Sequence, residues 1–190
     1  MKSYCIRLLV LIFLSPSFLS CDNPIEKSDQ KSTYKNYIDA LNQSDLTKAS
    51  SYISENFILS ELTFIQTNDK SDWFIQYKWD SVFQPNYKII EIVETDSNLI
   101  VTMSKICNRI RYLHNEPTII KSVIDFENGK ISKDNTYEYK VFDFNRWQSK
   151  RDSLVLWISI NHPSLDGFIY DQTIEGAQNY LKAIDLYTNK

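Results

Sequence analysis

Arg109 and Arg111 are the residues whose type and spacing most directly suggest binding chemistry. They lie in an apolar stretch, residues 99–112, whose pattern predicts a strand, and side chains two positions apart on a strand point to the same face. A guanidinium group binds carboxylates and phosphates through paired hydrogen bonds, so the two arginines could hold an anionic ligand if that face is concave. If the face is convex, they form a charged outer surface.

Residues that commonly act as nucleophiles or metal ligands are sparse. Cys107 is the only cysteine after residue 21, and the apolar pattern around it predicts a buried, inert thiol. The chain has two histidines and neither a CxxC nor an HExxH pattern. His114 falls in a predicted turn, where an exposed side chain is the ordinary case. We therefore expect no metal site and no cofactor.

The amino-terminal segment indicates export. Lys2 and Arg7 give it a positive start, residues 8–14 form an unbroken apolar run, and a Ser-Pro-Ser sequence then breaks that run. The run is too short to span a bilayer, which takes about 20 apolar residues, but it suits a signal peptide. The four residues Phe18-Leu19-Ser20-Cys21 resemble the lipobox of bacterial lipoproteins, in a variant form found in the Bacteroidota.

The lipobox resemblance implies cleavage before Cys21 and acylation of this cysteine, which would anchor the chain to a membrane of the bacterial cell envelope, on the periplasmic face or the cell surface. Two or three acyl chains make such an anchor effectively permanent, whereas one chain is marginal. The alternative is an ordinary secretory signal. We expect a signal peptide at 1–20, a flexible tether at 21–33 and a single domain at 34–190, with a helical extension at 143–190.

Composition excludes one class of partner. The chain has 190 residues, 21 Lys and Arg against 24 Asp and Glu, and a net charge of −3. No basic stripe interrupts this mild acidity, so we expect no binding to nucleic acid. The length suits one domain of ordinary size.

Hydrophobic periodicity changes along the chain from helix to strand and back. Tyr34, Tyr37, Ile38 and Leu41 share one helical face, with Ser32 or Thr33 as the cap. A second short helix follows Asp45, and a third follows Ser71. A strand is predicted at 57–65 and an antiparallel meander at 87–141, with a hairpin at Asn128-Gly129 and a bulge near Ser104-Lys105. Helices are predicted at 143–160 and 173–187. The expected fold class is α+β, with three N-terminal helices packed on a curved antiparallel sheet and two extra C-terminal helices.

Two segments resemble the nuclear-transport-factor-2-like superfamily, which includes ketosteroid isomerases and SnoaL-like cyclases. They are the stretch from Tyr37 to Leu46, which reads Tyr-x-x-Ala-Leu-Asn-x-x-Asp-Leu, and the hairpin from Asp125 to Ile131. The resemblance implies a cone with a pocket between the sheet and the helices. It also implies that Tyr37 stands where the isomerase has its oxyanion-hole tyrosine, and Glu61 where it has its base.

The same resemblance leaves ordinary structural roles open. Ser122 stands near the place where the isomerase has a second acid, and a core role for Tyr37 and a solvent-facing role for Glu61 remain alternatives. If the cone is open, Trp73, Tyr77, Arg109 and Tyr112 are expected to line it; if it is closed, the aromatic residues pack the core.

Three functions are therefore open. The first is a lipid-anchored, non-catalytic domain that binds a small apolar ligand or a partner protein. The second is an isomerase-like or SnoaL-like enzyme that uses Glu61 and Tyr37 for acid–base chemistry on a small hydrophobic substrate. The third is an adaptor that forms a homodimer through the outer face of its sheet. The aromatic, turn-rich residues 161–171 are a candidate contact surface, or else a connecting loop.

Overall fold

The computed structural model describes residues 27–190, so the predicted signal peptide, Cys21 and the first part of the tether lie outside the described residues. The helices are α1 (Lys27–Asn42), α2 (Leu46–Ser51), α3 (Lys70–Ser81), α4 (Asn108–Leu113), α5 (Phe144–Asn161) and α6 (Ile174–Thr188), with 3₁₀ turns η1 (Pro163–Leu165) and η2 (Phe168–Tyr170). The strands are β1 (Ile53–Glu61), β2 (Phe64–Thr67), β3 (Asn86–Glu94), β4 (Asn98–Ile106), β5 (Thr118–Glu127) and β6 (Lys130–Val141).

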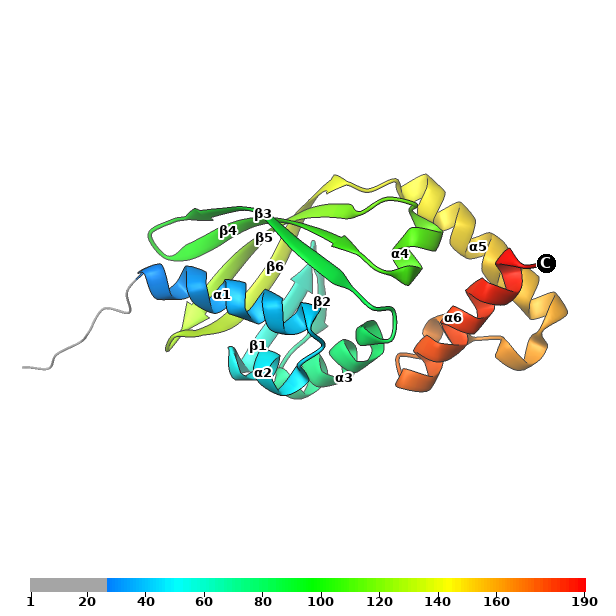
Figure 1. Ribbon diagram of the computed structural model, residues 1–190, viewed down its shortest axis with the longest axis horizontal. Coiled ribbons are helices and arrows are strands. Elements are labelled where there is room, and N and C mark those ends of the chain that lie inside the picture. The colour runs from blue at the N-terminus through cyan, green and yellow to red at the C-terminus, as the bar shows by residue number, and fades with distance from the viewer. Residues whose placement is uncertain (1–26) are drawn as a thin grey trace, which may run out of the picture.

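The strands form one sheet in the order β2-β1-β6-β5-β4-β3. Helices α1, α2 and α3 lie along one side of the curved sheet, and α5 and α6 lie beyond one end of it (Figure 1). The predicted α+β class is therefore confirmed. The sheet is mixed, however, because β1 pairs with β6 in parallel while every other pair is antiparallel.

Two hydrophobic clusters hold the described residues together. The first lies between α1, α3 and the sheet and includes the fully buried side chains of Tyr34, Phe57 and Leu99. The second lies among α4, α5 and α6 and includes Leu154 and Ile158 of the extension. The second cluster also contains Trp79 of α3 and Phe83, so the C-terminal helices pack against the end of α3.

Most predicted helix ends are confirmed by their caps. The side chains of Asp45, Asp143 and Thr173 accept hydrogen bonds from the first turns of α2, α5 and α6. The cap of α3 is Asp69 rather than Ser71, since its carboxylate accepts a 2.8 Å bond from the amide of Asp72. Helix α1 begins at Lys27, earlier than the predicted start, because no glycine or proline interrupts residues 27–33.

The main error in the predicted secondary structure is the long strand at 99–112, because a helix replaces its second half. Strand β4 ends at Ile106, and α4 follows with Cys107 as its cap, where the sulfur accepts a 3.4 Å bond from the amide of Ile110. The change of parity near Ser104 marks the approach to this strand end and not a bulge, because β4 pairs with β5 without a shift from Asn98 to Lys105.

The bulges that shape the sheet lie elsewhere, above all in β6. Its register against β5 shifts at Ser132 and again at Tyr137, since Ile131 and Lys133 face consecutive residues of β5, as do Thr136 and Glu138. Each shift reverses the side-chain alternation. Asp134 and Thr136 are consequently buried, whereas Tyr137, which regular alternation would place on the same face as Ile131, is 40% exposed.

Candidate functional site

A cavity of about 490 Å³ lies between the sheet and the helices. Its walls come from α1, α3, α4 and all six strands, together with Phe142, and Trp147 and Gln172 add a wall from the C-terminal extension. This volume lies within the range of sites that enclose small organic molecules. Tyr37, Glu61, Trp73, Tyr77 and Arg109, five residues singled out from the sequence, all line it.

The wall formed by α1 and α3 is aromatic. The indole N–H of Trp73 donates a 3.1 Å hydrogen bond to the hydroxyl of Tyr37, and the Trp73 and Tyr77 rings stack with centroids 5.2 Å apart. Burial, followed by the charge of Asp134, raises the pKa of Tyr37 well above its ordinary value. The phenol of Tyr37 is therefore protonated at neutral pH and available as a hydrogen-bond donor.

Asp134 of β6 is the carboxyl group that the sequence analysis missed. It lines the cavity, and burial raises its pKa to about 6, although the neighbouring hydroxyls of Ser122 and Tyr34 act to lower it. Regular alternation from Ile131 points residue 134 outward, so the bulge of β6 at Ser132 hid it. The raised pKa is the property that a general base working near neutral pH requires.

Glu61 of β1 has a different environment. The hydroxyl of Tyr139 donates to one carboxylate oxygen, and the side-chain amide of Gln66 donates to the other. Glu61 and Tyr37 share the cavity, but the carboxylate that raises the pKa of Tyr37 is that of Asp134. The charge of Asp134 thus acts on Tyr37, whereas Glu61 is hydrogen-bonded to Tyr139.

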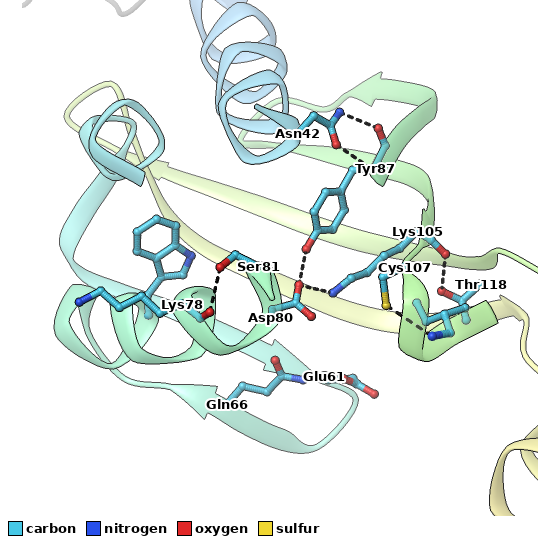
Figure 2. Close-up of polar contacts among 12 residues, drawn as sticks. Asn42, Glu61, Gln66, Lys78, Asp80, Ser81, Tyr87, Lys105, Cys107 and Thr118 are labelled. Carbon is cyan, nitrogen blue, oxygen red and sulfur yellow. Dashed lines mark hydrogen bonds and ion pairs between the residues drawn. The ribbon is translucent and has the colours of Figure 1, made fainter. Parts of the chain in front are cut away.

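Asp80 of α3 forms a buried polar cluster with Lys105 and Tyr87 (Figure 2). One of its oxygens accepts a 2.7 Å bond from the Lys105 ammonium and a 2.9 Å bond from the Tyr87 hydroxyl. Burial acts to raise the pKa of Asp80, but the charges of Lys105 and Arg109 and these hydrogen bonds bring it below its ordinary value. Asn42 fixes the Tyr87 backbone through two hydrogen bonds, so α1, α3 and the sheet meet at this cluster.

Arg109 and Arg111 do not act as a pair, because α4 is a helix and turns them apart. Arg109 lines the cavity, with its guanidinium carbon 4.6, 5.3 and 5.7 Å from the ring centres of Trp79, Phe83 and Trp147. Arg111 is exposed.

Tyr112 was expected in the pocket on the assumption that residues 99–112 form a strand. In the helix its hydroxyl reaches the Lys150 carbonyl and its ring packs on Tyr187, so it joins the second cluster and is not part of the lining.

The remaining reactive residues have structural roles. Cys107 is buried, as expected, and caps α4. His114 is buried rather than exposed, because its Nε2 accepts a 2.6 Å bond from the amide of Asp143 and its ring stacks on Phe142. Within residues 27–190 there is no cluster of potential ligands that could hold a metal ion. The helices of this described part include none with the length and apolar character needed to cross a membrane.

Solved structures with similar folds include an LEH-like epoxide hydrolase from M. tuberculosis, with 14% identity over 68% of this chain and 96% of that chain and a TM-score of 0.53. Bal32a, from a soil-derived mobile gene cassette, is 13% identical over 65% of this chain and 96% of that chain, with a TM-score of 0.53. A proposed ketosteroid isomerase from Kribbella flavida is 10% identical over 61% of this chain and 82% of that chain, with a TM-score of 0.51.

The chain shares the α+β cone fold of these structures, which is the nuclear-transport-factor-2-like fold expected from the sequence. No family model and no curated protein matches the sequence. At these identities the structural likeness establishes the fold alone, which hosts enzymes and binding proteins alike.

Proposed function

We propose that this chain binds a small organic molecule in the cavity of its cone. The observation that carries the proposal is the cavity of about 490 Å³, whose lining combines an aromatic wall with polar and charged side chains, several of them held by hydrogen bonds. In sites for small molecules, apolar area supplies affinity and fixed polar groups select the ligand. Trp147 and Gln172 support the proposal further, because the extension narrows the cavity with its own side chains.

Filling part of the cavity with a larger side chain tests this function directly. Gln76 of α3 lines the cavity, whereas its neighbour Ile75 is 58% exposed. We expect Gln76→Trp to weaken binding of small aromatic probes at least about tenfold by filling the volume, and Ile75→Trp to leave it unchanged. Isothermal titration calorimetry measures both variants against the unaltered protein. Equal affinities for all three would show that the probes bind elsewhere and would contradict the proposal.

Acid–base catalysis is a second candidate, favoured by one observation. Burial raises the pKa of Asp134 to about 6, which suits a base, and the protonated phenol of Tyr37 is a hydrogen-bond donor. Both side chains line the same cavity. Two structural neighbours carry the names of an epoxide hydrolase and a proposed ketosteroid isomerase. A β,γ-unsaturated ketosteroid and styrene oxide are therefore suitable first substrates.

The variants distinguish the two possible bases. We expect the protein to turn over one of these substrates, Asp134→Asn to abolish that turnover, and Glu61→Gln to change its rate by no more than about threefold. The opposite pattern would assign the base to Glu61, and no turnover of either substrate class would favour the non-catalytic function.

Lipid anchoring through Cys21 is proposed from the sequence, since this residue lies outside the described part of the chain. The supporting observation is that a positively charged start, an apolar run and lipobox-like residues follow one another in the sequence and end at Cys21. In a bacterial host we expect the full chain in the membrane fraction, with a mass increased by its acyl chains, and Cys21→Ser in the soluble fraction. An unmodified Cys21 in the exported protein would contradict the anchor.

A further inference from the structure

Arg109 is the cation of the cavity whose role the proposed function leaves open. Its guanidinium carbon lies within 6 Å of the ring centres of Trp79, Phe83 and Trp147, so aromatic surface surrounds it. Its Nε is buried and has no hydrogen-bond partner. Within residues 27–190 no carboxylate lies at ion-pair distance from it. A buried donor on a charged group destabilises the protein unless a partner satisfies it.

Three further charged groups of the cavity, Lys105, Asp80 and Glu61, already have partners. Lys105 is bound to Asp80, and Glu61 accepts hydrogen bonds from Tyr139 and Gln66. Asp134 lies on β6, beside the hydroxyls of Ser122 and Tyr34, and its charge acts on α1. Among the described residues, Arg109 thus has no carboxylate at ion-pair distance, although its charge helps to lower the pKa of Asp80. It lies where α3, α4 and α5 meet.

The chemistry of a guanidinium decides what can satisfy it. Its flat faces stack on aromatic rings, while its N–H groups lie in the plane and point outward from the edge. An oxyanion with two oxygens in one plane, such as a carboxylate, matches that edge with paired hydrogen bonds.

We infer that the ligand of this cavity is a small organic anion whose carboxylate binds Arg109, while its apolar body extends toward Trp73 and Tyr77. This inference deepens the proposed function and depends on it. Asp80, Glu61 and Asp134 also line the cavity. Their negative charges oppose a second charge on the ligand, so a monoanionic carboxylate is favoured over a phosphate dianion.

A matched pair of probes tests the inference. 1-Naphthaleneacetate and 1-naphthaleneacetamide have nearly the same size and shape and differ in charge. By isothermal titration calorimetry we expect the unaltered protein to bind the acid about tenfold more tightly than the amide. 1-Naphthyl phosphate, the third probe, is expected to bind more weakly than the acid.

Substitutions of Arg109 assign that preference to its charge. We expect Arg109→Gln to bind both naphthaleneacetic probes equally, with affinity for the amide unchanged. Arg109→Met keeps an apolar stem among the three rings, so it tests the same loss of charge if the glutamine variant does not fold. Arg109→Lys keeps the charge without the planar fork and should retain a reduced preference. Arg111→Gln, at an exposed position of the same helix, is the matched control and should behave as the unaltered protein.

The outcomes separate the two proposals. Binding of both probes without preference, or a preference that survives in Arg109→Gln and Arg109→Met, overturns the anion site and leaves small-molecule binding standing. Tighter binding of the phosphate overturns the choice of a carboxylate. Failure of both neutral and charged probes to bind contradicts the proposed function itself.

Discussion

At the scale of the residue, Asp134 is a buried carboxyl group whose charge state depends on folding. Its pKa in the folded protein is about 6, above the ordinary value of 3.8, because the carboxylate is buried. The folded state therefore binds a proton more tightly than the unfolded state does. This carboxyl group costs the protein stability as the pH rises from about 4 to 6, and the cost remains at higher pH.

The first prediction follows from the upward direction of the Asp134 pKa shift. Asp134→Asn removes the charge and should be more stable than the unaltered protein at pH 8 by about 3 kcal/mol at most, with the difference vanishing near pH 4. Urea unfolding at both values measures it. Glu138→Gln, exposed on the same strand, is the control and should show no such dependence on pH. A gain in stability that is the same at pH 4 and pH 8 would contradict the account of Asp134.

The ion pair between the buried Asp80 and the half-buried Lys105 gives the second prediction. Lys105→Met leaves the Asp80 carboxylate buried with only the Tyr87 hydroxyl as a donor, and we expect a loss of about 3 to 5 kcal/mol in the free energy of unfolding. The double variant Asp80→Asn with Lys105→Met removes both charges and should recover most of that loss. Urea unfolding at pH 7 checks this, and a double variant as unstable as the single one would mean that the pair is not the cause.

At the scale of the element, the close contact between α6 and the chain before it fixes one wall of the cavity. A methyl group on Gly176 would lie 2.1 Å from the backbone oxygen of Asp171. The same oxygen accepts a 3.1 Å hydrogen bond from the indole of Trp79, and the next residue, Gln172, lines the cavity. The absence of a side chain at residue 176 therefore lets α6 hold this wall in place.

The third prediction tests that contact. Gly176→Ala should destabilise the protein by about 1 to 3 kcal/mol, despite the higher helix propensity of alanine, because the clash involves backbone. We also expect a shift in tryptophan fluorescence as the Trp79 bond is lost. Gln178→Ala on the exposed side of α6 is the control. Unchanged stability and fluorescence for Gly176→Ala would show that the wall adapts without cost.

The elements also show how far the sequence alone can lead. Long periodic helices, their capping residues and the Asn128-Gly129 hairpin, with φ of 51° and 75°, were predictable because each has a local cause. Helix α4 was missed since its six residues are fewer than two turns and follow a strand directly. Asp134 was missed because a bulge depends on the partner strand, which no local pattern contains.

At the scale of the whole molecule, the cone and its extension work as one unit. The fold alone was predictable from residues 34–139, but the extension supplies Trp147 and Gln172 to the cavity, and no local pattern in residues 143–190 assigned these two side chains to it. Trp147 also brings α5 to Arg109. Shape and charge of the cavity are thus set jointly by segments far apart in the sequence.

The most direct measurement is a crystal structure of residues 22–190 grown with saturating 1-naphthaleneacetate. We predict the probe inside the cone, its carboxylate within hydrogen-bond distance of Arg109 and its rings against Trp73 and Tyr77. A cavity closed by its own aromatic side chains, or a probe bound only outside the cone, would contradict the central claim that this protein encloses a small organic ligand.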